Sequence, residues 1–471
     1  MHKVFVSRIA IGVLLTCSVR VTATAQKLTT LVGFDGNNGA TPQYMSLTQG
    51  ADGYLYGTTT LGGDLSCEEP YGCGTVFKLT PNGTLTTLHI FEATDGSRPY
   101  STLVQTVTGD FYGTTSQAGA SGYGTFFKIK PNGKFTTLHN FAGPPMEGSQ
   151  PIGSLTQGID GNFYGTTYGG GTNGYGVGTI FKITSDGVLT TLHSFDDGDG
   201  AFPIGGLVEA RGGIFYGTTE AGGITGDYGT VFKISADGTF TSLFTFDDSN
   251  GAAPQGTLLQ ASNGDFYGVT FEGGTGTNCV GGCGTVFEFT PNENVTSLYS
   301  FNYVDGANPV GGLIEGTDRN LYGSTSGGAD QNAGSLFRLT PARVLTTLDF
   351  HGSDGVVPYG PMIQSTSGSF YGTTSGGGTG RHGTIFVLDL GLGPFVTFVR
   401  AAGKVGQTGL ILGQGFTGTT SVAINGIPAN FTVVSDTCIK ATVPAGATTG
   451  YVTVNTPTGV LTSNVPFHVI P

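Results

Sequence analysis

Cysteine is the residue type whose spacing in this sequence points most directly to chemistry. Cys67 and Cys73 lie in one glycine-rich stretch, and Cys279 and Cys283 lie in another. In an exported protein, close cysteine pairs form local disulfides that hold a loop, so we predict one disulfide in each stretch. A zinc site shared by both pairs would require distant parts of the chain to meet, and it is the weaker interpretation. Cys438 has no nearby partner, and we expect it to pack as a small apolar side chain.

Three histidines at a regular spacing invite a metal interpretation. His89, His139 and His193 occupy one position of a repeated unit. In the other units this position holds Val32, Phe244, Tyr299 and Asp349. Because apolar and aromatic residues replace histidine there, a structural position on a strand explains it better than metal ligation.

An acid or amide followed by glycine stands before a proline in every unit. The seven pairs are Asn38-Gly39, Asp95-Gly96, Glu147-Gly148, Asp199-Gly200, Asn250-Gly251, Asp305-Gly306 and Asp354-Gly355. A circle of such groups could bind Ca²⁺ or a cationic ligand. Asp and Asn before Gly are also what turns require, and there is no Asp-x-Asp-x-Asp-Gly calcium loop. We favour the turn interpretation and expect neither a metal nor a cofactor.

Catalytic signatures are absent from the sequence. There is no Gly-x-Ser-x-Gly, His-Glu-x-x-His or phosphate-binding loop motif. Polar residues that occur in one unit only are Glu68, Glu69, Arg211, Glu220, Glu272 and Arg381. No spacing connects them, although a carboxylate pair could still assemble from distant units. We assign no catalytic residue, and we favour a binding protein over an enzyme.

These residues are all carried by one repeated unit. The run Tyr56-Gly57-Thr58-Thr59, or a close copy of it, returns with Tyr112, Tyr164, Tyr216, Tyr267, Tyr322 and Tyr371, at intervals of 49 to 56 residues. Each unit has four β-rich segments separated by turn signals such as Pro81-Asn82-Gly83. This pattern predicts an all-β, seven-bladed β-propeller. A β-solenoid is the alternative, but its repeats are generally shorter. We expect the repeated tyrosines to pack in the core rather than to form an aromatic platform for ligands.

The fourth segment predicts how the array closes. Six units carry it, for example as Leu85-Thr86-Thr87-Leu88, and the seventh does not. The missing copy stands near the N-terminus as Leu28-Thr29-Thr30-Leu31. We therefore expect the N-terminal strand to complete blade seven, which removes an open sheet edge. The longer glycine-rich and Asp-Gly loops then lie on one rim of the propeller, and we expect any ligand to bind on that rim.

The N-terminus indicates export. Residues 1–25 combine basic residues, an apolar run at 9–19 and the small-residue site Ala23-Thr24-Ala25, as a signal peptide does. A buried first strand and a lipoprotein signal are weaker alternatives. Removing this segment would take the formal net charge from −13 to −16. So acidic a chain argues against nucleic-acid binding, and we predict a secreted or extracytoplasmic monomer with no transmembrane segment.

The composition changes after Pro394, where short alternating strands predict a small β-sandwich. Runs G-x-G-F, I-N-G-x-P-A and V-P-A-G-A-x-x-G make this segment resemble an IPT/TIG domain, which has an immunoglobulin-like fold. Runs Y-G-T-T, G-T-[VI]-F-K and L-T-T-L-H-x-F make the array resemble the secreted bacterial repeats called GloVer. We predict a signal peptide at 1–25, a propeller at 26–392 and the Ig-like domain at 393–471. Neither resemblance implies an enzyme.

We therefore expect an exported binding or cell-surface interaction module that recognises a glycan or another extracellular ligand through its loop-bearing rim. The alternative is a secreted carbohydrate-active hydrolase or lyase on the same scaffold. A carboxylate pair in one deep pocket would favour that alternative.

Overall fold

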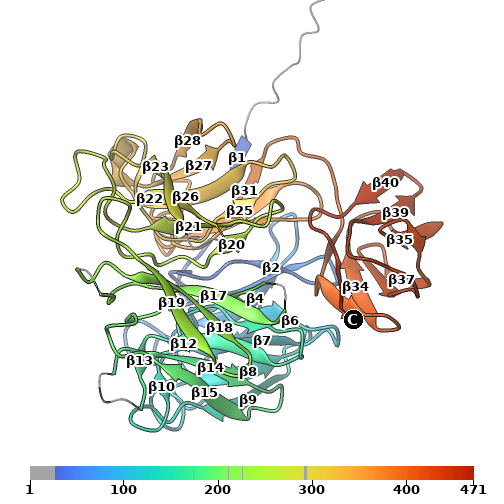
Figure 1. Ribbon diagram of the computed structural model, residues 1–471. Coiled ribbons are helices and arrows are strands. Elements are labelled where there is room, and N and C mark those ends of the chain that lie inside the picture. The colour runs from blue at the N-terminus through green and yellow to red at the C-terminus, as the bar shows by residue number, and fades with distance from the viewer. Residues whose placement is uncertain are drawn as a thin grey trace, which may run out of the picture.

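The computed structural model describes residues 27–470 except 173, 175, 211, 225 and 291–293, and its regular structure is β almost throughout (Figure 1). The predicted signal peptide, residues 1–25, lies outside the described residues. Within them, the 3-10 turn η1 (Asp330–Asn332) is the one helical element. No helix in this part of the chain is long and apolar enough to cross a membrane.

Seven antiparallel sheets, one per repeated unit, follow one another along the described chain. Units one and two hold β2 (Thr48–Gln49), β3 (Leu55–Thr59), β4 (Thr75–Leu79), β5 (Leu85–Ile90), β6 (Val104–Gln105), β7 (Phe111–Thr115), β8 (Thr125–Ile129) and β9 (Phe135–Asn140). Units three and four hold β11 (Thr156–Gln157), β12 (Phe163–Thr167), β14 (Thr179–Ile183), β15 (Leu189–Ser194), β16 (Val208–Ala210), β17 (Ile214–Thr219), β18 (Thr230–Ser235) and β19 (Phe240–Thr245). A short ribbon of β10 (Gly148–Ser149) and β13 (Gly169–Gly170) lies beside unit three.

Units five and six hold β20 (Leu259–Gln260), β21 (Phe266–Thr270), β22 (Thr285–Phe289), β23 (Val295–Ser300), β24 (Ala307–Pro309), β25 (Ile314–Glu315), β26 (Leu321–Gly327), β27 (Ser335–Leu339) and β28 (Leu345–Asp349). Unit seven supplies β29 (Ile363–Gln364), β30 (Phe370–Thr374) and β31 (Thr384–Asp389). Its fourth strand is β1 (Lys27–Gly33), which runs antiparallel to β31 with Leu28 opposite Leu388. The expected pairing of the N-terminal strand with the last unit is confirmed.

The Tyr-Gly-Thr-Thr motif is explained by packing between units. The Tyr56 ring is fully buried and stacks on Phe111 of unit two at a centroid distance of 4.1 Å. A Cβ on Gly57 would lie 2.7 Å from the ring of Phe77, so this position has no room for a side chain. The two threonines bond within and between units, Thr58 to the carbonyl of Pro99 and Thr59 to Thr75. The motif is therefore a requirement of the fold. The predicted core role is confirmed for five of the tyrosines, whereas Tyr216 and Tyr267 are half-buried.

Consecutive units are also joined by a hydrogen bond from a residue whose backbone is strained. The residue before the repeated proline has positive φ in every unit, although none of the seven is glycine. These residues are Thr41, Arg98, Gln150, Phe202, Ala253, Asn308 and Val357, with φ between 52° and 58°. In this conformation the amide of Arg98 donates to the carbonyl of Cys73 in the preceding unit, at 3.0 Å. Six further bonds of this kind repeat it along the array, and they offset the strain.

The last unit packs against the first. Tyr371 and Ile385 of unit seven share one buried cluster with Phe34, Leu55 and Phe77. The side chain of Gln49 also bonds to both the hydroxyl and the amide of Thr366. The series of sheets thus returns to its starting point, and Phe34 at the end of β1 lies within that contact.

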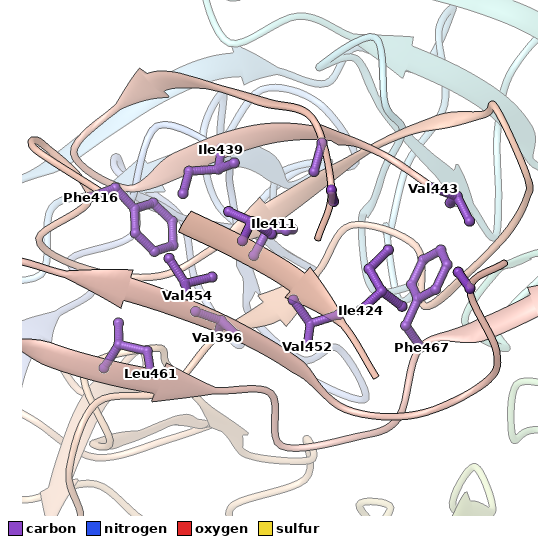
Figure 2. Close-up of a cluster of buried hydrophobic side chains, with 14 residues drawn as sticks. Val396, Ile411, Phe416, Ile424, Ile439, Val443, Val452, Val454, Leu461 and Phe467 are labelled. Atoms are coloured by element: carbon purple, nitrogen blue, oxygen red, sulfur yellow. The ribbon is translucent and has the colours of Figure 1, made fainter. Parts of the chain in front are cut away.

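The C-terminal residues form a sandwich of two four-stranded sheets. One holds β32 (Thr397–Phe398), β34 (Thr408–Leu412), β38 (Cys438–Thr442) and β37 (Phe431–Ser435), and the other β36 (Ile427–Pro428), β35 (Ser421–Ile424), β39 (Val452–Thr456) and β40 (Gly459–Thr462). The short strands β33 (Ala402–Lys404) and β41 (His468–Ile470) pair in parallel beside them. Figure 2 shows the core between the sheets, where Ile411 and Ile439 of one sheet lie near Val452 and Val454 of the other.

This sandwich sits on the tight-turn side of the array. The hydroxyl of Thr437 donates to the carbonyl of Ala51, and the guanidinium of Arg400 donates to the carbonyl of Gly158, both at 3.1 Å. Ala51 and Gly158 belong to turns between the first and second strands of their units. The sandwich therefore contacts the tight-turn rim of the array, and the longer loops lie on the opposite rim.

Candidate functional site

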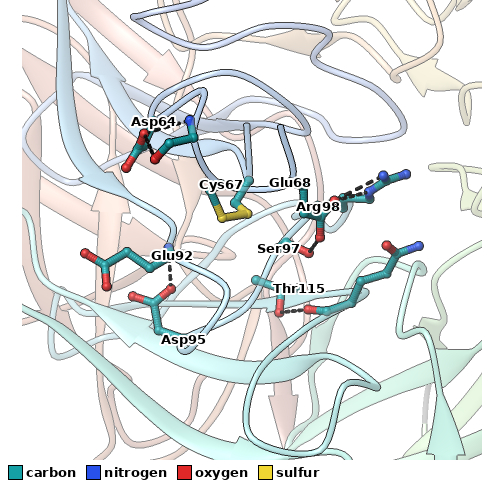
Figure 3. Close-up of a disulfide and its surroundings, with 11 residues drawn as sticks. Asp64, Cys67, Glu68, Glu92, Asp95, Ser97, Arg98 and Thr115 are labelled. Atoms are coloured by element: carbon teal, nitrogen blue, oxygen red, sulfur yellow. Dashed lines mark hydrogen bonds and ion pairs between the residues drawn. A yellow bond between two sulfur atoms is a disulfide. The ribbon is translucent and has the colours of Figure 1, made fainter. Parts of the chain in front are cut away.

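Both predicted cysteine pairs are disulfide-bonded. Cys67–Cys73 and Cys279–Cys283 close loops between the second and third strands of units one and five. Figure 3 shows the first, with Glu68 beside it pairing with Arg98 of the next unit at 3.1 Å. Since the carbonyl of Cys73 also accepts the Arg98 amide, this disulfide holds a junction between units.

The one free cysteine of the described residues offers no reactive thiol. Cys438 is 2% exposed in the sandwich, and burial raises the pKa of its thiol to about 11. A thiol of such high pKa stays protonated and unreactive near neutral pH.

The three repeated histidines pair with the acids that precede glycine. His89 contacts Asp95 at 2.9 Å, and His193 contacts Asp199 at 2.8 Å. His139 and Glu147 make the same contact at 3.1 Å. Burial of Asp199 opposes its ionisation, but its hydrogen bonds to His193 and Asp196 lower the pKa overall. These carboxylates form hydrogen bonds that hold their own loops, which agrees with the turn interpretation.

Sequence reasoning considered the histidines and the acids separately and missed their partnership. The signal for it lay in the variation among the units. Units with His or Tyr on the fourth strand carry an acid in the loop that follows, as in Tyr299 and Asp305. Units with Val32 or Phe244 carry Asn38 or Asn250. In the described parts of the chain, no three His, Cys, Asp or Glu side chains are grouped to hold a metal.

Of the six polar residues unique to one unit, the structure brings one into a cavity. Glu69 and Arg381 are exposed, Glu68 is paired as described, and Arg211 lies outside the described residues. Glu220 lines a cavity of about 330 Å³ on the loop-bearing side. Glu272 is exposed, but its charge acts on Glu220.

Two repeated positions whose residue type varies supply most of the cavity wall. The position three residues before the leucine of each first segment contributes Tyr44, Tyr100, Ile152, Ile204 and Gln255. The position after the Tyr-Gly-Thr-Thr motif contributes Ser116, Tyr168 and Glu220, and Gln117 and Gln150 complete the wall. Apart from Glu220, sequence reasoning did not select these residues. Their signal is variation at a position flanked by residues that every unit repeats.

Aromatic contacts order this cavity. The ring centroid of Tyr44 lies 5.7 Å from that of Tyr100 and 5.4 Å from that of Tyr359. Tyr168 stacks on Phe202 at 4.9 Å. Burial raises the pKa of Tyr44, and nearby Tyr359 and Glu220 raise it further, so the phenol stays protonated and can donate a hydrogen bond.

The cavity also holds one ionisable acid. The amide of Gln255 donates to Glu220 at 2.7 Å. Burial nevertheless raises the pKa of Glu220, and the charge of Glu272 adds to the increase. Among the described residues Glu220 is the one carboxylate that lines this cavity, so the carboxylate pair of a glycoside hydrolase is not assembled there.

A larger cavity, about 590 Å³, lies between the array and the sandwich. Arg400 and Glu209 both face it, and burial lowers the pKa of Arg400 and raises that of Glu209. This cavity is part of the contact between the array and the sandwich.

Comparison with known proteins agrees with this architecture. The sequence matches the model of the Gloeobacter/Verrucomicrobia repeat over residues 17–227, 63–280 and 213–427, and that of the IPT/TIG domain over residues 394–469. Both resemblances are thereby confirmed. No curated protein matches the chain.

Solved structures share the fold at low identity. A streptogramin B lyase is 15% identical over 77% of this chain and 97% of its own, with a TM-score of 0.53. Virginiamycin B lyase from Staphylococcus aureus is 15% identical over 77% and 98%, with a TM-score of 0.52. A fungal alcohol oxidase in complex with copper is 14% identical over 94% and 99%, also at 0.52. At these identities the likeness concerns the all-β, propeller-like fold alone.

Proposed function

The chain belongs to the Gloeobacter/Verrucomicrobia repeat family and ends in an IPT/TIG domain, and from this premise we propose that it is an exported binding module for an extracellular glycan. The cavity of tyrosines, glutamines and Glu220 on the loop-bearing rim is the proposed site. Aromatic rings pack against sugar faces, while amide and carboxylate groups bond to hydroxyls.

The proposed scaffold is a closed seven-bladed propeller at residues 26–392 with the Ig-like domain at 393–471. Packing of unit seven on unit one supports the closure. Two disulfides support residence outside the reducing cytosol, after removal of residues 1–25 as a signal peptide.

One observation carries the proposal: the cavity lies at the positions where the units differ, on the rim opposite the sandwich. Residues that every unit repeats are accounted for by packing. A binding role fits this distribution, because recognition of one ligand must break the symmetry of the repeat.

A glycan array probed with residues 26–471 tests the proposal, with product analysis on each glycan bound. We expect binding without turnover. The variants Tyr168→Ala and Gln150→Ala should weaken binding, whereas Tyr71→Ala should not, because Tyr71 is 59% exposed and lies outside the cavity. Absence of any bound glycan would contradict the proposal, and cleavage of a bound glycan would favour the hydrolase or lyase instead.

A further inference from the structure

We propose that the cavity on the loop-bearing rim selects a ligand carrying an organic ammonium group, such as the free amine of a deacetylated amino sugar. This inference rests on the proposed function and names the chemical class of its ligand. It is carried by three features of the cavity: an acid with no cationic partner among the described residues, aromatic faces near that acid, and a second acid whose charge acts on it.

The acid is Glu220, whose position in the sheet is fixed. It follows directly on β17, and its amide donates to the carbonyl of Phe202 at 3.1 Å. Gln255 donates to one of its carboxylate oxygens, Oε1, at 2.7 Å. Ion pairs among the described Lys, Arg and His side chains do not include Glu220. A half-buried carboxylate of this kind is stabilised by a cation that the ligand brings.

The aromatic faces come from units one, two and three. Tyr44, Tyr100 and Tyr168 line the cavity together with Glu220. Tyr44 and Tyr168 are both near enough to Glu220 for its charge to raise their pKa, although burial is the larger cause for each. A cation within about 6 Å of an aromatic centroid is attracted by the electron density of its face, and aromatic walls with an acid are the usual environment for ammonium ligands.

Charge discriminates against the other ligand classes. Glu272 from unit five adds a second negative charge near Glu220. The whole chain has a formal net charge of −13. The guanidinium of Arg98 acts on Tyr100 in the cavity wall, but it is paired with Glu68. An anionic sugar or a phosphate would therefore meet the negative charge of Glu220, and a neutral sugar would leave Glu220 without a cation. An ammonium group satisfies both the carboxylate and the tyrosine faces.

The test compares two ligands that differ only in this group. Calorimetry on residues 26–471 would measure binding of a β-1,4-linked glucosamine hexamer and of its fully N-acetylated counterpart, at a pH where the amines are protonated. We expect the amine-bearing hexamer to bind at least about tenfold more tightly, the scale of one desolvated charge and cation–π contact.

Variants then assign the effect to the cavity. Glu220→Gln should remove most of this preference, and Glu69→Gln should keep it, because Glu69 is an exposed acid on the same rim outside the cavity. Tyr168→Phe should keep the preference and Tyr168→Leu should reduce it. Melting temperatures identify any variant that fails to fold, and the remaining variants still decide the result.

Two outcomes would overturn the inference in different ways. Equal affinity for the two hexamers, or a preference that Glu220→Gln leaves intact, would remove the ammonium specificity and leave glycan binding in place. If neither hexamer nor any glycan on the array bound, the proposed function would fail together with it.

Discussion

Removal of β1 tests how the array is held together. A chain that begins at Gly36 lacks the strand that pairs with β31 and also lacks Phe34. The β1 ladder matches six residue pairs, from Lys27 with Asp389 to Gly33 with Thr384. Phe34 is fully buried, lies 5.7 Å from Phe77 by ring centroid, and donates its amide to the carbonyl of Gly383.

The loss can be estimated from these contacts. Burying one phenylalanine side chain contributes about 1.5–3 kcal/mol, and each net backbone hydrogen bond contributes about 0.5–1.5 kcal/mol. Several such bonds together with Phe34 reach on the order of 5 kcal/mol, which is comparable to the whole free energy of unfolding of many domains. Deletion also leaves β31 as an open sheet edge, which invites aggregation.

Thermal and urea unfolding of chains beginning at Gln26 and at Gly36 would measure the effect. We expect a large fall in melting temperature for the shorter chain, with partial recovery when a peptide of residues 27–34 is added. Phe34→Ala should reproduce about 3–5 kcal/mol of the loss, whereas Lys27→Ala, at an exposed position, should be close to neutral. Equal melting temperatures for the two chains would refute the closing role of β1.

Three further predictions concern changes of one or two residues each. Gly57→Ala should destabilise the protein by about 1–3 kcal/mol, because its Cβ would lie 2.5 Å from Met45 and 2.7 Å from Phe77. The control in urea unfolding is Gly409→Ala, because a Cβ at Gly409 would have no atom within 4 Å. Equal losses of stability in the two variants would contradict the packing argument. Replacing both Cys67 and Cys73 by serine should cost about 2 kcal/mol for a loop this short, and an unchanged urea midpoint would show that the loop is held by other contacts. Glu220 has a folded pKa above its usual 4.5, so the stability associated with its neutral form is present at low pH and is lost as pH rises through the folded value. Glu220→Gln should therefore gain stability relative to the natural chain above that value and lose the advantage in acid, and a stability difference that does not change with pH would contradict this assignment.

The repeat made most of the fold predictable. Seven exact or close copies of Tyr-Gly-Thr-Thr located the second strands, and the missing fourth segment identified the partner of β31. The loop cysteines were correctly paired because each pair is local in sequence. Such patterns can be interpreted because a residue's role in one unit can be compared with the same position in the other units.

The site was less predictable, for two physical reasons. The cavity gathers Tyr44, Tyr168 and Gln255 from units far apart in sequence, and no spacing encodes that meeting. The positive φ of residues such as Val357 runs against residue preference, since a β-branched side chain before proline rarely adopts it. It is imposed by hydrogen bonds to the neighbouring unit, which a local pattern does not reveal.

Glu220 is where the requirements of the fold and of a ligand can be separated. The same position in the other units holds Thr60, Ser116, Tyr168, Phe271, Ser326 and Ser375, so the repeat accepts small, polar and aromatic residues there and does not require a carboxylate. Glu68 is also unique to its unit, but it is engaged by Arg98 and Ser97 across a junction, which gives it a structural role. Among the described residues Glu220 has no such cation, and burial disfavours its charged form. A half-buried acid at a position where the other units use neutral residues is best explained by what it binds.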